Sequence, residues 1–138
     1  MANEALVQAV KEIVTLAKAG NLEQSYMGYR DLFAKPEFTT YRPEDQRQAL
    51  KLMIHAKSAT SQPTQAAVDA HRAAIGPLIE LVSVHAEPAD HEMLGMCHVV
   101  LGNEESASSI FKAGLAIERE RSPQSDLCGA LMRRVSLL

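Results

Sequence analysis

The sequence contains no tryptophan, and tyrosine and phenylalanine together make up only 4% of its 138 residues. A hydrophobic core must therefore be built mainly from Ala, Leu, Val, Ile and Met, which supply most of the 46% of residues that are apolar. Cysteine is also scarce. Cys97 and Cys128 are too few for a disulfide scaffold and suit a reducing compartment, although the sequence leaves a single bridge between them open.

Two further absences narrow the class of protein. The formal net charge is −3 at neutral pH, so the chain lacks the excess of basic residues that nucleic-acid binding requires. No stretch approaches the roughly 18 consecutive apolar residues of a membrane-spanning helix, and the start, Met-Ala-Asn-Glu, lacks the pattern of a signal peptide. We therefore expect a cytoplasmic protein with one domain, residues 1–138, that binds neither nucleic acid nor membrane.

Apolar residues recur at helical spacing, and no segment shows the sustained alternation of a β-strand. Over residues 3–19 they fall three and four positions apart, which places them on one helix face. Gly20 provides a stop, and Asn21 can cap a second helix over about 22–35, which Pro36 ends. The pattern predicts an all-α chain of about seven helices in antiparallel pairs.

Proline marks the starts of later helices, because a proline in the first helical turn removes no hydrogen bond that the helix needs. We expect such starts at Pro43, Pro63 and Pro88. The helix that begins at Pro43 should reach about residue 59. The last helix, 123–137, should begin at Pro123 with Ser122 as its cap.

Gly76-Pro77 falls inside the predicted fourth helix. The proline ring crowds the carbonyl of the preceding turn, so we expect a kink or a short break near residue 75.

Three nine-residue segments align without gaps at offsets of 42 and 40 residues: 25–33, 67–75 and 107–115. Each begins with a small residue and carries a ring four residues later, respectively Ser25 and Tyr29, Ala67 and His71, and Ala107 and Phe111. A small residue one turn before a ring lets a neighbouring helix approach closely while the ring fills the gap beside it. The repetition predicts three similar helix pairs.

The last of these segments belongs to a unit that resembles the tetratricopeptide repeat. Leu94-Gly95 in its first helix, and Ala107 and Phe111 in its second, match that family in identity and spacing. The family pattern has a side chain with a ring at two positions of the first helix, and here both are histidines, His91 and His98.

The resemblance covers nearly the whole chain and is clearest in residues 88–121. It implies an α-solenoid of three degenerate repeats with a C-terminal capping helix: 3–37, 44–84 and 88–121, then 123–137. The first unit matches through Gly20 and Tyr29, and the second matches weakly. Arg119 stands where the family has a closing proline, and the spacing near 40 exceeds the family's usual 34, which implies longer helices or connections.

Stacked helix pairs carry a groove lined by the first helix of each pair. The resemblance implies an adaptor, scaffold or chaperone that binds a peptide or helix of a partner protein there, without a cofactor. The family pattern puts these residues in the groove: Val10, Val14, Ala17, Leu52, Ala56, Glu92, Met96 and Val99. Because all but Glu92 are apolar, the groove suits a hydrophobic segment or an amphipathic helix. Two alternatives stay open: the chain's own last helix, or a second copy in a homodimer, fills the groove.

The stretch 85–98 suggests a different function, because it holds three histidines, one cysteine and three carboxylates. His91 and His98 share a helix face but lie about 10 Å apart along the axis, too far for one zinc ion. Cys97 is adjacent to His98 in the sequence, so the two side chains point in different directions on a helix. They are therefore poorly placed to act as a nucleophile and its general base. The chain also lacks a glycine-rich phosphate loop, a serine elbow and a His-Glu-x-x-His motif. A metal or enzymatic centre at His91, Cys97 and His98 is therefore the alternative to the interaction module, and we expect neither metal nor catalysis.

Overall fold

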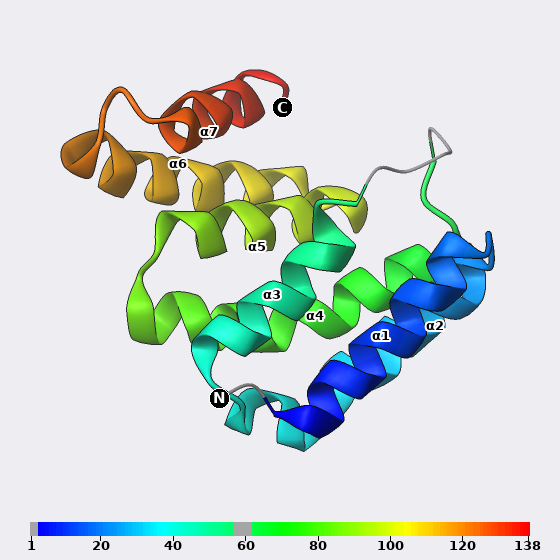
Figure 1. Ribbon diagram of the computed structural model, residues 1–138. Helices are drawn as coiled ribbons and strands as arrows, with labels where there is room; N and C mark the ends of the chain where they lie inside the picture. Colours follow the sequence, from blue (N-terminus) through cyan, green and yellow to red (C-terminus); the bar gives the residue numbers. More distant parts are fainter. Residues whose placement is uncertain (1–2, 57–61) are drawn as a thin grey trace. The chain divides into compact units, whose positions relative to one another are not determined.

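The computed structural model describes residues 3–56 and 62–138, and in these residues there are seven α-helices, one short 3₁₀-helix and no β-strand (Figure 1). The elements are α1 (Glu4–Lys18), α2 (Leu22–Ala34), η1 (Pro36–Thr40), α3 (Pro43–Ile54), α4 (Gln65–His85), α5 (Pro88–Val100), α6 (Glu104–Arg121) and α7 (Asp126–Ser136). The predicted all-α class is confirmed.

The chain divides into two compact units, Met1–Pro77 and Leu78–Leu138. The division falls inside α4 and does not follow the expected repeat boundaries, so the single domain with three repeat units stays a prediction.

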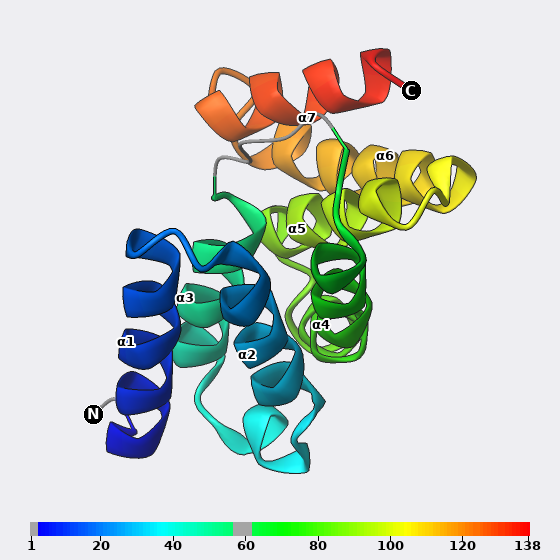
Figure 2. The ribbon, with the colours of Figure 1, turned by 90° about the vertical axis from the view of Figure 1, so that its right-hand side faces the viewer.

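A glycine turn joins α1 to α2 in the first unit. Gly20 has a φ of 85°, in the left-handed region that only glycine adopts without steric cost. Its N–H donates to the Ala17 carbonyl at 3.1 Å, and the Asn21 N–H donates to the Leu16 carbonyl at 2.9 Å. Gly102, with a φ of 81°, ends α5 through the same pair of hydrogen bonds at 3.0 and 2.8 Å. These are Schellman turns, and they fold α1–α2 and α5–α6 into helical hairpins whose helices lie side by side (Figure 2).

Glycine also sets how closely α5 and α6 approach. A Cβ atom built on Gly95 would lie 2.3 Å from the Phe111 ring, so the ring occupies the space that any other residue at 95 would fill. A Cβ atom on Gly114 would lie 2.7 Å from the Cβ of His91. The residues on which the repeat resemblance depends, Gly95 and Phe111 above all, therefore touch one another in the folded chain.

The α1–α2 hairpin also packs a glycine of one helix closely against a large side chain of the other. Here the glycine is Gly28 on the second helix, and a Cβ atom on it would lie 2.8 Å from Cγ1 of Ile13 on the first. Both hairpins thus pack a glycine of one helix against a large side chain of the other.

Aromatic rings of the first unit gather around η1, an element that the sequence did not predict. Tyr29 and Phe33 of α2 stack with ring centroids 5.7 Å apart, and Phe33 meets Phe38 of η1 edge to face at 5.1 Å. Phe38, which is fully buried, meets Tyr41 at 6.1 Å. Residues 78–138 hold one such ring, Phe111.

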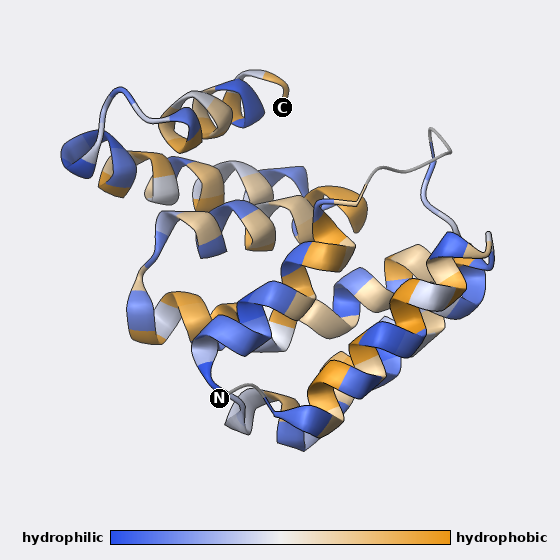
Figure 3. Ribbon diagram, viewed as in Figure 1, coloured by the Kyte–Doolittle hydropathy of each residue, from blue (hydrophilic) through white to orange (hydrophobic). Residues whose placement is uncertain are grey.

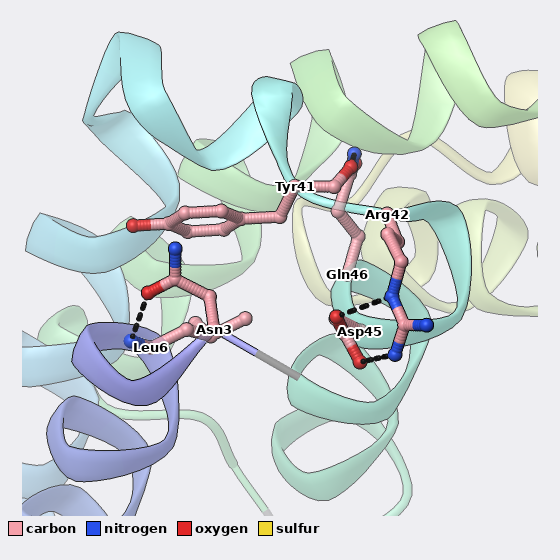
Figure 4. A network of polar contacts seen from close by, with 6 residues as sticks. All are labelled: Asn3, Leu6, Tyr41, Arg42, Asp45 and Gln46. Carbon is pink, nitrogen blue, oxygen red and sulfur yellow. Dashed lines mark hydrogen bonds and ion pairs between the residues drawn. The ribbon is translucent and has the colours of Figure 1, made fainter. Parts of the chain in front are cut away.

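A buried amide fixes the connection from η1 to α3. Nε2 of Gln46 donates to the Thr39 carbonyl at 3.3 Å. It also donates to the Tyr41 carbonyl at 2.7 Å, and Figure 4 shows these two residues side by side. In the same region Arg42 pairs with Asp45 through two bonds of 3.1 and 3.3 Å. The main-chain carbonyls of Thr39 and Tyr41 thereby receive hydrogen bonds within this irregular segment.

Three predicted boundaries are corrected by the structure. The last helix begins at Asp126 and not at Pro123, because the Ser125 hydroxyl, not Ser122, accepts the helix N–H of Cys128 at 3.0 Å. Similarly, α4 begins at Gln65 and not at Pro63, since Thr64 Oγ1 accepts the N–H of Ala67 at 3.2 Å.

The helix from Pro43 ends at Ile54, where the sequence predicted about 59; residues 57–61 lie outside the described part of the chain. The α4 helix also runs unbroken through Gly76 and Pro77, so the short break is excluded, whereas the alternative, a kink, stays a prediction. Ala74 and Leu78, on either side of the proline, are buried.

We expect Gly95→Ala to lower the free energy of unfolding by about 1–3 kcal/mol, because the Phe111 ring must move to admit the methyl group. Gly129→Ala is the matched control: its new Cβ would meet only the flexible end of Arg133 at 3.5 Å, so the better helix former should raise stability by about 0.5–1 kcal/mol. Urea denaturation followed by far-ultraviolet circular dichroism measures both. A stabilised Gly95→Ala variant would contradict the close packing.

We expect stability to fall in mild acid because of His71. Burial lowers the pKa of His71, against the smaller opposing effect of the 2.7 Å hydrogen bond from its Nδ1 to the Ala67 carbonyl. The unfolded chain therefore takes up a proton below about pH 6.5 while the native ring stays neutral, so this stabilisation is complete above that pH and is lost below it. In His71→Phe the unfolding free energy should fall less between neutral and mildly acidic pH. Equal losses in both proteins would exclude His71 as the cause.

Candidate functional site

The eight predicted groove positions divide between the two units, five in the first and three in the second. In the first unit, α1 carries Val10, Val14 and Ala17 half-buried along one side, next to the buried Leu6 and Ile13. Figure 3 shows apolar and polar residues alternating along α1. Leu52 on α3 and Ala56, just after that helix, are exposed.

Sequence reasoning missed one member of this set. Val7 is 38% exposed and stands three residues before Val10, so it continues the same side of α1. We call Val7, Val10, Val14 and Ala17 the α1 stripe. The signal that could have found Val7 is its helical spacing from Val10.

In the second unit, the chain's own last helix bonds to one of the three predicted groove positions and shares a buried cluster with a second. Glu92 is buried, and its Oε2 accepts from Nε of Arg134 on α7 at 2.8 Å. Met96 packs against a buried cluster formed by α6 and α7: Ala107, Phe111, Leu115, Cys128 and Leu131. Val99, one turn further along α5, is 42% exposed. The bond between Arg134 and Glu92 is compatible with closure by the last helix, which was the first of the two alternatives, and the groove itself stays a prediction.

Polar contacts hold the start of α7 and the ends of the α5–α6 hairpin. The Ser125 hydroxyl donates to Glu118 Oε2 at 2.7 Å. Arg121 donates to both carboxylate oxygens of Glu87, at 3.0 and 3.3 Å. Sequence reasoning missed the Arg121–Glu87 and Arg134–Glu92 pairs, because the two residues of each pair lie 34 and 42 positions apart in the sequence. The only signal was Glu92 itself, a lone charge on an otherwise apolar helix face.

The alternative centre at His91, Cys97 and His98 consists of residues held by packing. Nδ1 of His91 donates to the Glu87 carbonyl at 2.9 Å, and its Cβ lies against Gly114. Cys97 is fully buried, and burial raises its pKa to about 12. Burial also lowers the pKa of His98, whose Nδ1 is buried and lacks a hydrogen-bond partner among the residues described. Within the described ranges, no group of three or more His, Cys, Asp or Glu is arranged to hold a metal ion.

Comparison with known proteins finds no matching family model, no similar curated protein and no similar solved structure. Over residues 3–56 and 62–138, none of the helices has both the length and the apolar character needed to cross a membrane.

We expect Cys97 to be unreactive in the native protein, because a buried thiol with a pKa of about 12 supplies almost no thiolate at neutral pH. Iodoacetamide should label it only when guanidinium chloride unfolds the chain, as peptide mass spectrometry can measure. Rapid labelling of Cys97 in the folded protein would instead support the enzymatic alternative.

Proposed function

We propose that the chain is a tetratricopeptide-like protein-interaction module, and that its α1 stripe binds an apolar peptide or an amphipathic helix of a partner protein. The observation that carries this proposal is the α1 stripe itself. Val10, Val14 and Ala17 keep part of their apolar surface exposed, and Val7 is exposed beside them.

The length of the α1 stripe supports a helical ligand. Its four residues fall at i, i+3, i+7 and i+10, so they cover about 15 Å along one side of the helix. An amphipathic partner helix presents its own apolar residues at the same spacing and over a similar length. Burying such surface contributes roughly 25 cal/mol for each Å² removed from water.

The α1–α2 hairpin supports the proposal because it offers this surface in a fixed form. The hydrogen bonds of the Gly20 turn and the close contact of Gly28 with Ile13 hold the two helices together before any ligand arrives. A preformed binding surface pays less ordering entropy on association than a flexible one.

The contacts around the alternative centre also favour an interaction module. The His91 ring is engaged by the Glu87 carbonyl, and Cys97 lies in the core as a protonated thiol. These surroundings suit packed side chains, which supports the proposal of an interaction module.

The test compares tagged wild type with Val14→Glu and, as a matched control, Gln8→Glu. Both variants add one negative charge to α1, but Gln8 is exposed on the side away from the α1 stripe. Quantitative pull-downs with wild type and with Gln8→Glu should recover the same partner proteins. With Val14→Glu, recovery of these partners should fall roughly tenfold or more, since a charge buried in an apolar interface is costly. Circular dichroism checks that Val14→Glu remains folded.

Equal recovery by all three proteins would refute the α1 stripe as a binding surface. Analytical ultracentrifugation adds a second reading: a wild-type dimer that only Val14→Glu dissociates would identify a second copy of the chain as the occupant.

A further inference from the structure

Two lysines border the α1 stripe on its exposed side. Lys11 follows Val7 by four residues and Lys18 follows Val14 by four, so each lysine lies one helical turn from a valine of the α1 stripe. Both lysines are exposed, and they stand seven residues apart on the same side of the helix. The apolar band of α1 therefore carries a row of positive charge along one edge.

The arrangement is that of a coiled-coil seam. The α1 stripe fills positions a and d of two successive heptads, and the two lysines fill position e. Position g, on the other edge, is Leu6 and Ile13, which are buried in the unit. In a coiled coil, side chains at a and d face the partner helix, and charges at e and g select the partner through interhelical ion pairs. Selection by charge at this seam therefore falls to the edge with the lysines.

The helix itself does not neutralise these two charges. No carboxylate lies three or four residues from Lys11 or Lys18, which is the spacing at which ion pairs form on a helix. Among the described residues, neither lysine takes part in an ion pair. The helix dipole favours Lys18 in the last turn, but it does not account for Lys11 in the middle of α1. Both lysines are therefore available to the carboxylates of a bound helix.

A second copy of α1 supplies only part of the matching charge. Glu4, seven residues before Lys11, is the one carboxylate of α1 in the same row, because Glu12 lies outside it. Two copies packed through this seam would pair at most one lysine of each α1 with a carboxylate and leave the other without an opposite charge. A helix with carboxylates at every seventh position complements both lysines, so the row favours a different protein as the partner.

We propose that the α1 stripe selects a partner's amphipathic helix that carries a row of carboxylates, seven residues apart, along one edge of its apolar face. It rests on the proposed function of the α1 stripe, and it adds the charge of the ligand. The whole chain has a net charge of −3, so long-range attraction favours a basic ligand. A preference for an acidic helix can therefore come only from local charges such as Lys11 and Lys18.

Two designed peptides test this preference by fluorescence polarisation with the full-length protein. Both have three heptads with leucine at a and d; one has glutamate at e and g, and the other has lysine there. Wild type should bind the glutamate peptide about tenfold more tightly than the lysine peptide, and added salt should reduce this ratio. Equal affinities, tighter binding of the lysine peptide, or binding of neither would overturn the proposal.

Lys11→Glu tests the residue itself, with Lys112→Glu on α6 as the matched control, since that lysine is also exposed and the change in net charge is the same. Lys11→Glu should bind the glutamate peptide about fivefold more weakly and the lysine peptide about fivefold more tightly than wild type. A misfolded variant cannot gain affinity in this way. Lys112→Glu should bind both peptides as wild type does, and equal effects of the two variants would overturn the role of Lys11.

Val14→Glu separates this inference from the proposed function. If wild type binds both peptides equally and Val14→Glu binds neither, the α1 stripe is a binding surface without selection by charge, and only the inference fails. If Val14→Glu binds both peptides as well as wild type does, the proposed function fails with it. A wild-type dimer that Val14→Glu dissociates, but that an excess of the glutamate peptide does not, would assign the α1 stripe to a second copy and overturn the inference.

Discussion

The contact between Gly95 and Phe111 is the interaction on which the second unit depends. The ring lies where a β-carbon of residue 95 would be, so α5 and α6 approach more closely than two ordinary helices could. The same ring belongs to the buried cluster that receives Cys128 and Leu131 of α7. One side chain therefore joins all three helices, and it is the only tyrosine, phenylalanine or tryptophan among residues 78–138. The absence of a Cβ at position 95 is what permits this arrangement.

The two hairpins share a type of turn and a type of helix contact, although their sequences differ. Both turn at a left-handed glycine with the same pair of hydrogen bonds. Within the helix contact, α5–α6 has a glycine on each helix, Gly95 and Gly114, whereas α1–α2 has Gly28 on its second helix. Close approach requires one residue without a Cβ facing one large residue, and either helix can supply either partner.

Local signals predicted much of the fold, and contacts between distant residues explain what they missed. The turn at Gly20 and the start at Pro88 depend on residues a few positions apart, and both lie where the sequence predicted. The start of α7 was misplaced because Ser122 and Ser125 are both acceptable caps, and the bond from Ser125 to Glu118 of α6 distinguishes them. For the candidate site, helical spacing predicted the apolar side of α1. The pairing of Glu92 with Arg134 could not be predicted, because it depends on how α7 packs against α5.

The uneven distribution of rings has a spectroscopic consequence. All three tyrosines, Tyr26, Tyr29 and Tyr41, lie in the first unit, and the chain has no tryptophan. Tyrosine fluorescence and near-ultraviolet tyrosine signals therefore report the melting of Met1–Pro77 and are nearly blind to α5, α6 and α7. Far-ultraviolet ellipticity, by contrast, registers helices of both units. If the two optical transitions occur at different temperatures, the units unfold separately, and no single melting temperature describes the whole chain.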